Sequence, residues 1–417
     1  MSEYAAFVGF DWADKKHDLC LVDAASGKKE FSVIKHTPQA IQEWATSVRL
    51  RFGGRKVAVC LEQSRGPLIF ALLKYDFLVP YPINPPTLSN YREAFSPSRA
   101  KDDPRDAEYA VELLIHHRDR LKAWPPDSEQ TRTLQYLVER RRRVVTGRTR
   151  ISNRMTALLK LYFPQVLEWF DDIRTDLVCD FLLQWPTLEE VKKVRRATLE
   201  KFLREHNSVR KQGNEQRLCS MKATVALTTD RAVIESSVLM MKTLAQQMKT
   251  ALSAIKEFDK KIKELCASHE DYHLFASLPG SGSVYSSRLL AAFGTDRERF
   301  ESADEMARLS GIAPVIERSG QSSWIRWRYF CPKFLRQSFH EYAGESIKHS
   351  FWARAYYAEQ KAKGKGHQAS VRALAFKWIR IIYRCWQTRT EYNEVKYLEN
   401  LRKKGSPLLG YAANNPQ

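Results

Sequence analysis

The sequence predicts a chain of mixed class, with an N-terminal α/β domain followed by two mostly helical domains. Three observations support this prediction. Short apolar runs alternate with helical patterns over residues 4–85, two long apolar patterns at helical spacing follow, and the last third is largely helical. With 417 residues, 43% of them hydrophobic, the chain is long enough for two or three separate cores.

The N-terminal domain is expected to contain a sheet. Strands are predicted at 5–11, 17–23, 30–35, 56–62 and 78–83, with helices near 37–51 and 67–75. Short turns separate the first three strands, and a helix precedes the fourth. Three antiparallel strands followed by strand–helix alternation is the order of the ribonuclease H-like fold. That fold places metal-binding acids at the ends of its central strands and on a late helix.

Two of the expected strands end in a carboxylate. Asp11 follows the apolar run 5–10, and Glu62 follows the run 56–61. An isolated carboxylate adds nothing to a core, because burying its charge is costly. Hard cations such as Mg²⁺ are held by carboxylate oxygens, often together with phosphate oxygens. The two strand ends therefore indicate a metal site.

A second pair of acids lies at a predicted helix start. Pro104 suits the first helical position, which makes Asp103 the expected N-cap and Asp106 the N3 residue. Capping alone would explain both acids, and Asp102 is the nearest alternative ligand. A spacing of three also places both carboxylates on one helix face. Together with Asp11 and Glu62, the pair favours a Mg²⁺ centre.

The charge of the chain indicates a polyanionic partner. Lys and Arg outnumber Asp and Glu by 68 to 48, so the formal net charge is +20. No apolar stretch reaches the roughly 18 residues that a spanning helix needs, which disfavours a membrane. The N-terminus lacks the features of a signal peptide. We expect a cytoplasmic protein that binds nucleic acid.

A helical region follows Trp124-Pro125-Pro126. Two long apolar periodicities, one over about 134–159 and one over about 234–265, predict an antiparallel coiled coil or a helical dimerisation stalk. A polar, helical insertion at about 170–230, with a loose turn at Gly213-Asn214, separates them. The first helix is rich in arginine, which indicates either a solvated face or contacts with phosphates; its arginines are Arg140, Arg141, Arg142, Arg143, Arg148, Arg150 and Arg154.

The last third begins with the turn Leu278-Pro279-Gly280-Ser281-Gly282 between two helical segments. Such a turn resembles a helix-hairpin-helix, whose backbone N–H groups bind a DNA phosphate, although a tight interhelical turn would look the same. Aromatic and basic residues then interleave over 318–336, a pattern suited to stacking on bases and pairing with phosphates. The basic candidates for nucleic-acid contacts are Arg318, Arg326, Arg328 and Lys333.

These motifs resemble a known family. The strand end Phe10-Asp11, the step Leu61-Glu62-Gln63-Ser64 and the helix start 101–107 resemble the DEDD tetrad of insertion-sequence transposases of the one-ten type. The segments 278–282 and 309–314, with Ser319-Gly320, resemble the second half of that family. The resemblance spans nearly the whole chain in order and covers the insertion poorly.

The resemblance implies a specific activity and architecture. It implies a RuvC-like domain at 1–124, a coiled-coil domain at 125–272 and a C-terminal transposase domain at 273–417 that carries a nucleophilic serine. Such proteins are DNA recombinases guided by a structured bridge RNA that pairs with target and donor DNA. They act as homo-oligomers, here a dimer or tetramer expected at the bacterial nucleoid. Asp11, Glu62, Asp103 and Asp106 would bind Mg²⁺.

The same resemblance implies that Ser319 would attack a DNA phosphate and form a phosphoserine link. This chain has Gln321 inserted before Ser322-Ser323, and 324–332 replaces a small, glycine-containing stretch, so Ser322 and Ser323 remain alternative nucleophiles. Two other functions stay open. One is a structure-selective nuclease that uses the acids alone, and the other is a non-catalytic nucleic-acid scaffold.

Overall fold

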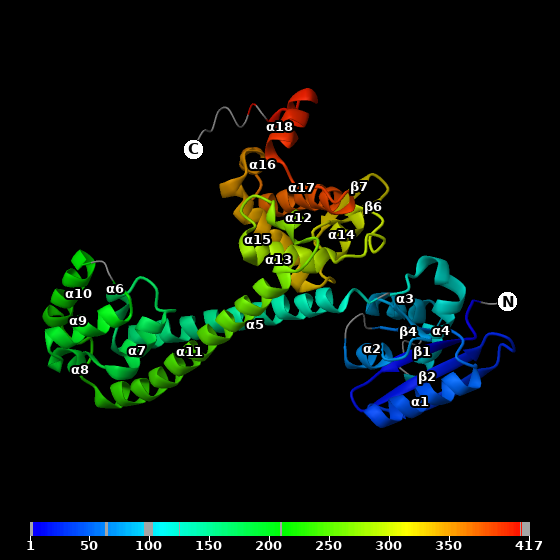
Figure 1. Cartoon of the computed structure of the whole chain (residues 1–417), viewed down its shortest axis with the longest axis horizontal. Helices are drawn as coiled ribbons and strands as arrows, with labels where there is room; N and C mark the ends of the chain where they lie inside the picture. Colours follow the sequence, from blue (N-terminus) through cyan, green and yellow to red (C-terminus); the bar gives the residue numbers. More distant parts are fainter. Residues whose placement is uncertain are drawn as a thin grey trace. The chain divides into compact units, whose positions relative to one another are not determined.

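The computed structural model describes residues 3–62, 66–95, 103–124, 126–208, 211–408 and 410, without the side chains of residues 103, 211 and 212. The chain forms two compact units, an N-terminal unit (1–126) and a C-terminal unit (127–417), which are treated separately below. Figure 1 labels their elements. A mixed α/β N-terminal unit and a largely helical C-terminal unit confirm the predicted fold class. No helix in the described ranges is long and apolar enough to cross a membrane.

The N-terminal unit contains a five-stranded sheet in the order β3-β2-β1-β4-β5. Strands β1, β2 and β3 are antiparallel neighbours, as the sequence pattern predicts, and β4 and β5 run parallel to β1. The strands are β1 (Ala6–Trp12), β2 (Lys16–Asp23), β3 (Lys29–Lys35), β4 (Val57–Leu61) and β5 (Leu78–Pro82). Strand β2 begins at Lys16, one residue before the predicted start of that strand.

Helices cover both faces of this sheet. Val8, Phe10 and Leu61 pack with α1 (Pro38–Arg51) and α2 (Pro67–Leu72) on one face. The residues of β4 that alternate with Leu61, such as Ala58 and Cys60, point to the other face. They pack there with α3 (Pro85–Phe95) and α4 (Asp103–His117). The short 3₁₀ helix η1 (Arg118–Arg120) follows. Strand β4 is buried along its whole length, as expected for a strand covered on both faces.

Helix α4 approaches the sheet at a glycine. A Cβ atom at Gly9 of β1 would lie 2.7 Å from the nitrogen of Val111 and closer still to the backbone oxygen of Ala107. Only a residue without a side chain therefore permits this contact. It holds the first turns of α4 against the part of β1 that leads to Asp11.

The C-terminal unit is built on two long antiparallel helices, α5 (Glu129–Tyr162) and α11 (Arg231–Ala267), which lie side by side in Figure 1. Contacts along the pair fix its direction. Gln130 donates to the oxygen of Leu265, and Arg141 pairs with Asp259 further along. Of the two predicted arrangements, an antiparallel pair within one chain is therefore present.

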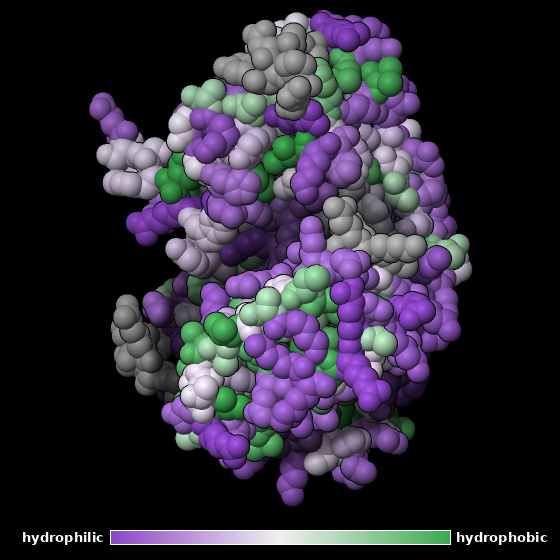
Figure 2. All heavy atoms as spheres, turned by 90° about the vertical axis from the view of Figure 1, so that its left-hand side faces the viewer, coloured by the Kyte–Doolittle hydropathy of each residue, from purple (hydrophilic) through white to green (hydrophobic). Residues whose placement is uncertain are grey.

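A separate hydrophobic core lies at the end of this pair where α5 finishes and α11 begins. Phe181, Trp169 and Phe202 are central to this distal lobe. Its helices are α6 (Gln165–Trp169), α7 (Asp176–Gln184), α8 (Leu188–Lys193), α9 (Arg196–Glu205) and α10 (Lys211–Ala223). The predicted loose turn at Gly213-Asn214 is wrong, because both residues lie within α10. The outer surface of the lobe, which faces the viewer in Figure 2, is mainly hydrophilic.

The C-terminal lobe packs around three fully buried tryptophans, Trp352, Trp378 and Trp386. Residues of α5 and α11, including Leu134 and Ile262, join the same core. The lobe contains α12 (Tyr272–Ala276), α13 (Gly282–Phe293), α14 (Ala303–Leu309), β6 (Val315–Ser319), β7 (Ser322–Arg326), α15 (Lys333–His349), α16 (Phe351–Ala362), α17 (His367–Gln387) and α18 (Glu394–Lys403).

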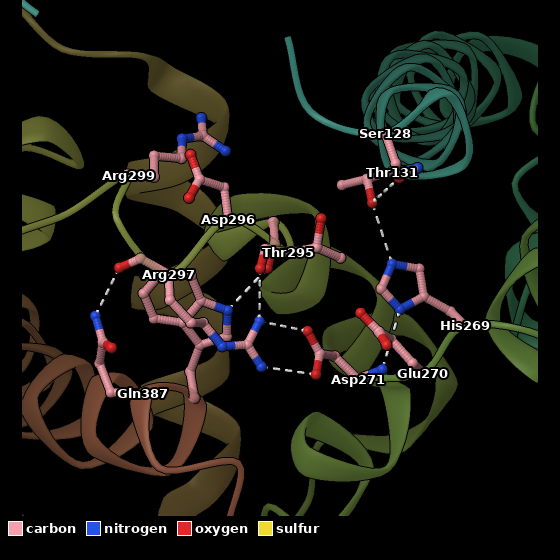
Figure 3. A network of polar contacts seen from close by, with 12 residues as sticks. Ser128, Thr131, His269, Glu270, Asp271, Thr295, Asp296, Arg297, Arg299 and Gln387 are labelled. Carbon is pink, nitrogen blue, oxygen red and sulfur yellow. Dashed lines mark hydrogen bonds and ion pairs between the residues drawn. The ribbon is translucent and has the colours of Figure 1, made fainter. Parts of the chain in front are cut away.

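A buried polar network joins the lobe to α5 and to the segment that follows α11 (Figure 3). Arg297 donates to both oxygens of Asp271, at 2.5 and 2.7 Å. The backbone N–H of Asp271 donates to His269 Nδ1, which makes the opposite ring nitrogen the donor to Thr131 of α5. Because these groups are buried, each needs its partner, and the network fixes the start of α5 relative to the lobe.

Candidate functional site

Two buried aspartates face each other at the end of the sheet where β1 finishes and β2 begins. Asp11 of β1 is directly opposite Asp18 of β2, and the two residues are 9% and 4% exposed. Directly opposite residues of antiparallel strands point to the same face. Lys16 Nζ lies 3.2 Å from Asp18 Oδ2 and offsets part of the negative charge of Asp18. Asp18 was not among the acids predicted as ligands, although it lies within the predicted strand 17–23.

Glu62 lies at the neighbouring strand end. Phe10 of β1 pairs with Leu61 of β4, so Asp11 and Glu62 both follow this last registered pair. Glu62 is half-buried and lies two residues beyond Cys60. Because side chains alternate along a strand, it belongs to the same side of the sheet as Cys60, the side that α4 covers. Burial and, secondarily, the negative charge of Glu62 raise the pKa of the Cys60 thiol to about 12.

Asp106 is carried by the helix that covers this face. It is 4% exposed, and both its oxygens accept hydrogen bonds from Arg92 Nη1, at 3.0 and 2.8 Å. The approach of α4 at Gly9 holds its first turns over β1. The Asp103 backbone begins α4, whereas the Asp103 side chain and Asp102 lie outside the described residues. Sequence reasoning also missed Arg92.

The donor chemistry at this edge suits a hard divalent cation. Buried carboxylates come from β1, β2 and α4, and a half-buried one follows β4. Among the side chains that the structure describes, no group of three or more acidic, histidine or cysteine residues is close enough to hold a metal ion. In this structure Asp106 is instead bound by Arg92, which offsets the negative charge.

Ser319 lies at the tip of an exposed hairpin in the C-terminal unit. Strands β6 and β7 pair with Ser319 opposite Ser322, and Gly320 adopts a φ of +57° in the two-residue loop between them. All three candidate serines, Ser319, Ser322 and Ser323, are exposed. Ser319 and Ser322 share one face of the ribbon, whereas Ser323 pairs with Arg318 and projects from the other.

The sequence did not predict this hairpin. Its signal was the two-residue loop Gly320-Gln321 between two short alternating runs. The ribbon presents Ile316, Trp324 and Ile325 to solvent, although large hydrophobic side chains are usually buried. Arg326 pairs with Glu317 at 3.0 Å across the strands, and Arg318 is exposed.

The predicted nucleic-acid contacts fall into two groups. Of the arginines on α5, Arg140, Arg143, Arg150 and Arg154 are exposed, and Lys333 is exposed at the start of α15. Arg141 and Arg142 instead make ion pairs with Asp259 and Glu341, at 2.5 and 2.6 Å. Arg148 and Arg328 are half-buried. The first group is better placed to contact a phosphate.

The class of the protein follows from two matches to family models of transposases. One match covers the sheet with its acids, and the other lies in the helical second half. Residues 8–164 match a transposase model of the DEDD type, and residues 272–358 match the model described as "Transposase IS116/IS110/IS902 family". The chain belongs to this IS110-type family of insertion-sequence transposases.

Relatives extend this likeness over the full length. A Streptomyces coelicolor protein that bears the name of a mini-circle transposase for IS117 is 26% identical over 419 residues, which cover 98% of each chain. The IS900 uncharacterized 42 kDa protein of Mycobacterium paratuberculosis is 30% identical over 152 residues, 36% of this chain and 38% of that protein. An uncharacterized IS116 protein of Streptomyces clavuligerus is 23% identical, covering 68% of this chain and 70% of its own.

Proposed function

We propose that this transposase cuts and rejoins DNA with a RuvC-like acidic centre and a serine nucleophile. The observation that carries the first part is the set of acids on one face of the sheet. Asp11 and Asp18 are buried opposite each other, Glu62 follows the next strand, and Asp106 lies on the covering helix. The strand order 3-2-1-4-5 supports the ribonuclease H-like fold.

Asp11, Glu62, Asp106 and Asp103 would hold Mg²⁺. When bound, the ion would stabilise negative charge at the scissile phosphate. Asp18 supports the Asp11 carboxylate position from β2, and Arg92 holds Asp106 until a cation competes for its oxygens.

Ser319 is proposed as the attacking group. Its hydroxyl oxygen would form a bond to the DNA phosphorus as the bond to the leaving deoxyribose oxygen breaks, and the serine proton would be transferred to that oxygen. A strand-end hydroxyl then displaces the serine and restores a phosphodiester. The exposed hairpin supports this role, because the Ser319 side chain is accessible to a DNA strand.

The chemistry is tested with purified full-length protein, donor DNA, target DNA and RNA transcribed from the flanking non-coding sequence. Strand exchange and the covalent protein–DNA adduct are measured on denaturing gels. We expect both to be lost in Ser319→Ala and retained in Ser322→Ala. Cleavage that persists in Ser319→Ala would instead establish a metal-dependent nuclease. Nucleic-acid binding without any cleavage, equal in the unsubstituted protein and in Asp11→Asn, would leave only a scaffold.

We also propose that a bridge RNA and a second protomer complete the site. The net charge of +20 and the exposed arginines of α5 suit an RNA partner. Base pairing by this RNA would select target and donor. RNA that copurifies with the protein should map beside its gene, and its absence would contradict the guided mechanism.

Complementation tests the shared site. The acids and Ser319 belong to different units of the chain. A mixture of Asp11→Asn and Ser319→Ala proteins should recover strand exchange if one protomer supplies acids and another supplies the serine. Activity no higher than that of either variant would show that each protomer works alone.

A further inference from the structure

A cavity of about 700 Å³ lies in the C-terminal unit, between the α5–α11 pair and the start of α13. Five basic side chains line it: Arg141, Arg142, Lys260, Lys263 and Arg288. Two carboxylates, Asp259 and Glu341, also line it, which leaves a surplus of three positive charges. A hollow with this surplus attracts an anion.

The carboxylates do not neutralise the two lysines. Asp259 accepts hydrogen bonds from Arg141, at 2.5 and 3.1 Å. Glu341 accepts from Arg142 at 2.6 Å and from Arg288 at 2.7 Å. Within the described part of the chain, Lys260 and Lys263 have no ion pair, whereas the neighbouring Lys261 pairs with Glu264 at 3.4 Å. Their charges remain available to a ligand.

Arg288 lacks one acceptor. Its side chain is 4% exposed, Nε donates to Ser338 Oγ at 3.0 Å, and Nη1 donates to Glu341. Nη2 is buried and finds no acceptor among the described residues. A buried donor without an acceptor is costly, so nearly all such groups are satisfied in folded proteins. An anion in the cavity would supply the acceptor.

The positive end of α13 lies at the same cavity. Ser283 and Val284, in its first turn, are lining residues, and Ser281 provides no side-chain cap. The first N–H groups of a helix have no acceptor within the helix and favour a phosphate. The start of α13, the buried guanidinium of Arg288 and the two lysines therefore all favour a ligand that carries a phosphate group.

The size and aromatic lining indicate more than inorganic phosphate. Tyr272 and Tyr285 line the cavity and also pack against the C-terminal core, which holds their rings in place. Fixed aromatic rings provide stacking surfaces for bases. We propose that the cavity binds one nucleotide, with its phosphate at Lys260, Lys263 and Arg288 and its base against Tyr272 or Tyr285. If the nucleotide belongs to a bound strand, this inference rests on the proposed function.

Photo-cross-linking of the full chain tests the proposal. The probes are a single-stranded DNA and an RNA 20-mer, each containing a 4-thio pyrimidine, with AMP or inorganic phosphate as competitor. Cross-links should map to the segment that holds Tyr272 and Tyr285. Lys263→Glu should lower their yield on the order of tenfold, because it reverses a charge at the phosphate. Lys261→Glu, a charge reversal outside the lining, should not.

The outcomes separate the two sources of the nucleotide. Competition by AMP, with inorganic phosphate much weaker, supports a site for a free nucleotide. A strand cross-link that resists AMP supports a nucleotide within a strand. Cross-links elsewhere, equal yields in the two lysine variants, or equal competition by phosphate would overturn the proposal. Asp11→Asn should retain the cross-link, so loss of strand cleavage and loss of this site are distinguishable.

Discussion

Gly9 of β1 lies against the backbone of α4, where a Cβ atom would be 2.7 Å from the nitrogen of Val111 and even closer to the oxygen of Ala107. Asp11 is two residues beyond Gly9, and Asp106 directly precedes Ala107. This glycine therefore lets the helix and strand that carry two of the candidate ligands approach each other. The site depends on a backbone contact as well as on its acids.

Substitution of Gly9 tests this dependence. We expect Gly9→Ala to lower the free energy of unfolding by about 1–3 kcal/mol, because the new methyl group must push α4 away. Hydrogen exchange should become faster in α4. Gly147→Ala is the control, since the helical Gly147 has nothing within 4 Å of a Cβ atom. Unchanged exchange in α4 of Gly9→Ala would show that the helix adjusts without loss.

Asp18 is predicted to support the metal centre. Asp18→Asn removes the charge opposite Asp11 in β2 and should reduce metal affinity or strand cleavage about 10- to 100-fold. The measurement is cleavage rate as a function of Mg²⁺ concentration. Asp14→Asn, at an exposed position in the preceding turn, should cleave normally. If both variants behave alike, Asp18 has only a structural role.

Acid should weaken the network around His269. Burial lowers the pKa of His269 below its ordinary value of about 6.5. The unfolded chain then takes up this proton more readily than the folded chain. The stabilisation is therefore complete above the ordinary pKa and is lost as the pH falls from there through the lowered pKa of the folded chain.

Denaturant unfolding at about pH 7.5 and about pH 5.5 measures this loss. The fall in stability should be smaller in His269→Gln than in the unsubstituted protein. The exposed His273 serves as a control, and His273→Gln should leave the pH dependence unchanged. An equal pH dependence in all three proteins would argue against His269 as a contributor.

The exposed arginines of α5 are predicted to contact phosphates. Replacing Arg143 and Arg150 by alanine should weaken DNA binding and flatten the plot of log affinity against log salt, by about 0.9 for each lost contact with duplex DNA. Arg174→Ala is the control, because Arg174 is paired with Asp172 at 2.8 Å. An unchanged slope in the double variant would mean that α5 exposes these charges to solvent only.

Local patterns gave most of the N-terminal fold. The strands around Asp11 and Glu62 were predicted within one or two residues, because apolar runs bounded by polar turns report on strands directly. The hairpin at Ser319 was not predicted, because its strands are short and exposed and each contains only two apolar residues. Helix α10 was predicted as containing a turn, since Gly213-Asn214 favours one unless surrounding contacts stabilise a helix.

The sequence by itself determined the mixed class, the succession of strands and helices in the N-terminal unit, and the positions of Asp11, Glu62 and Asp106 near element ends, since each depends on neighbours along the chain. Only the tertiary structure placed Asp18 opposite Asp11, Arg92 on Asp106, and two lysines and a buried arginine around one cavity. These relationships depend on strand register and helix docking. Both are fixed by contacts between residues far apart in sequence, which local patterns do not encode.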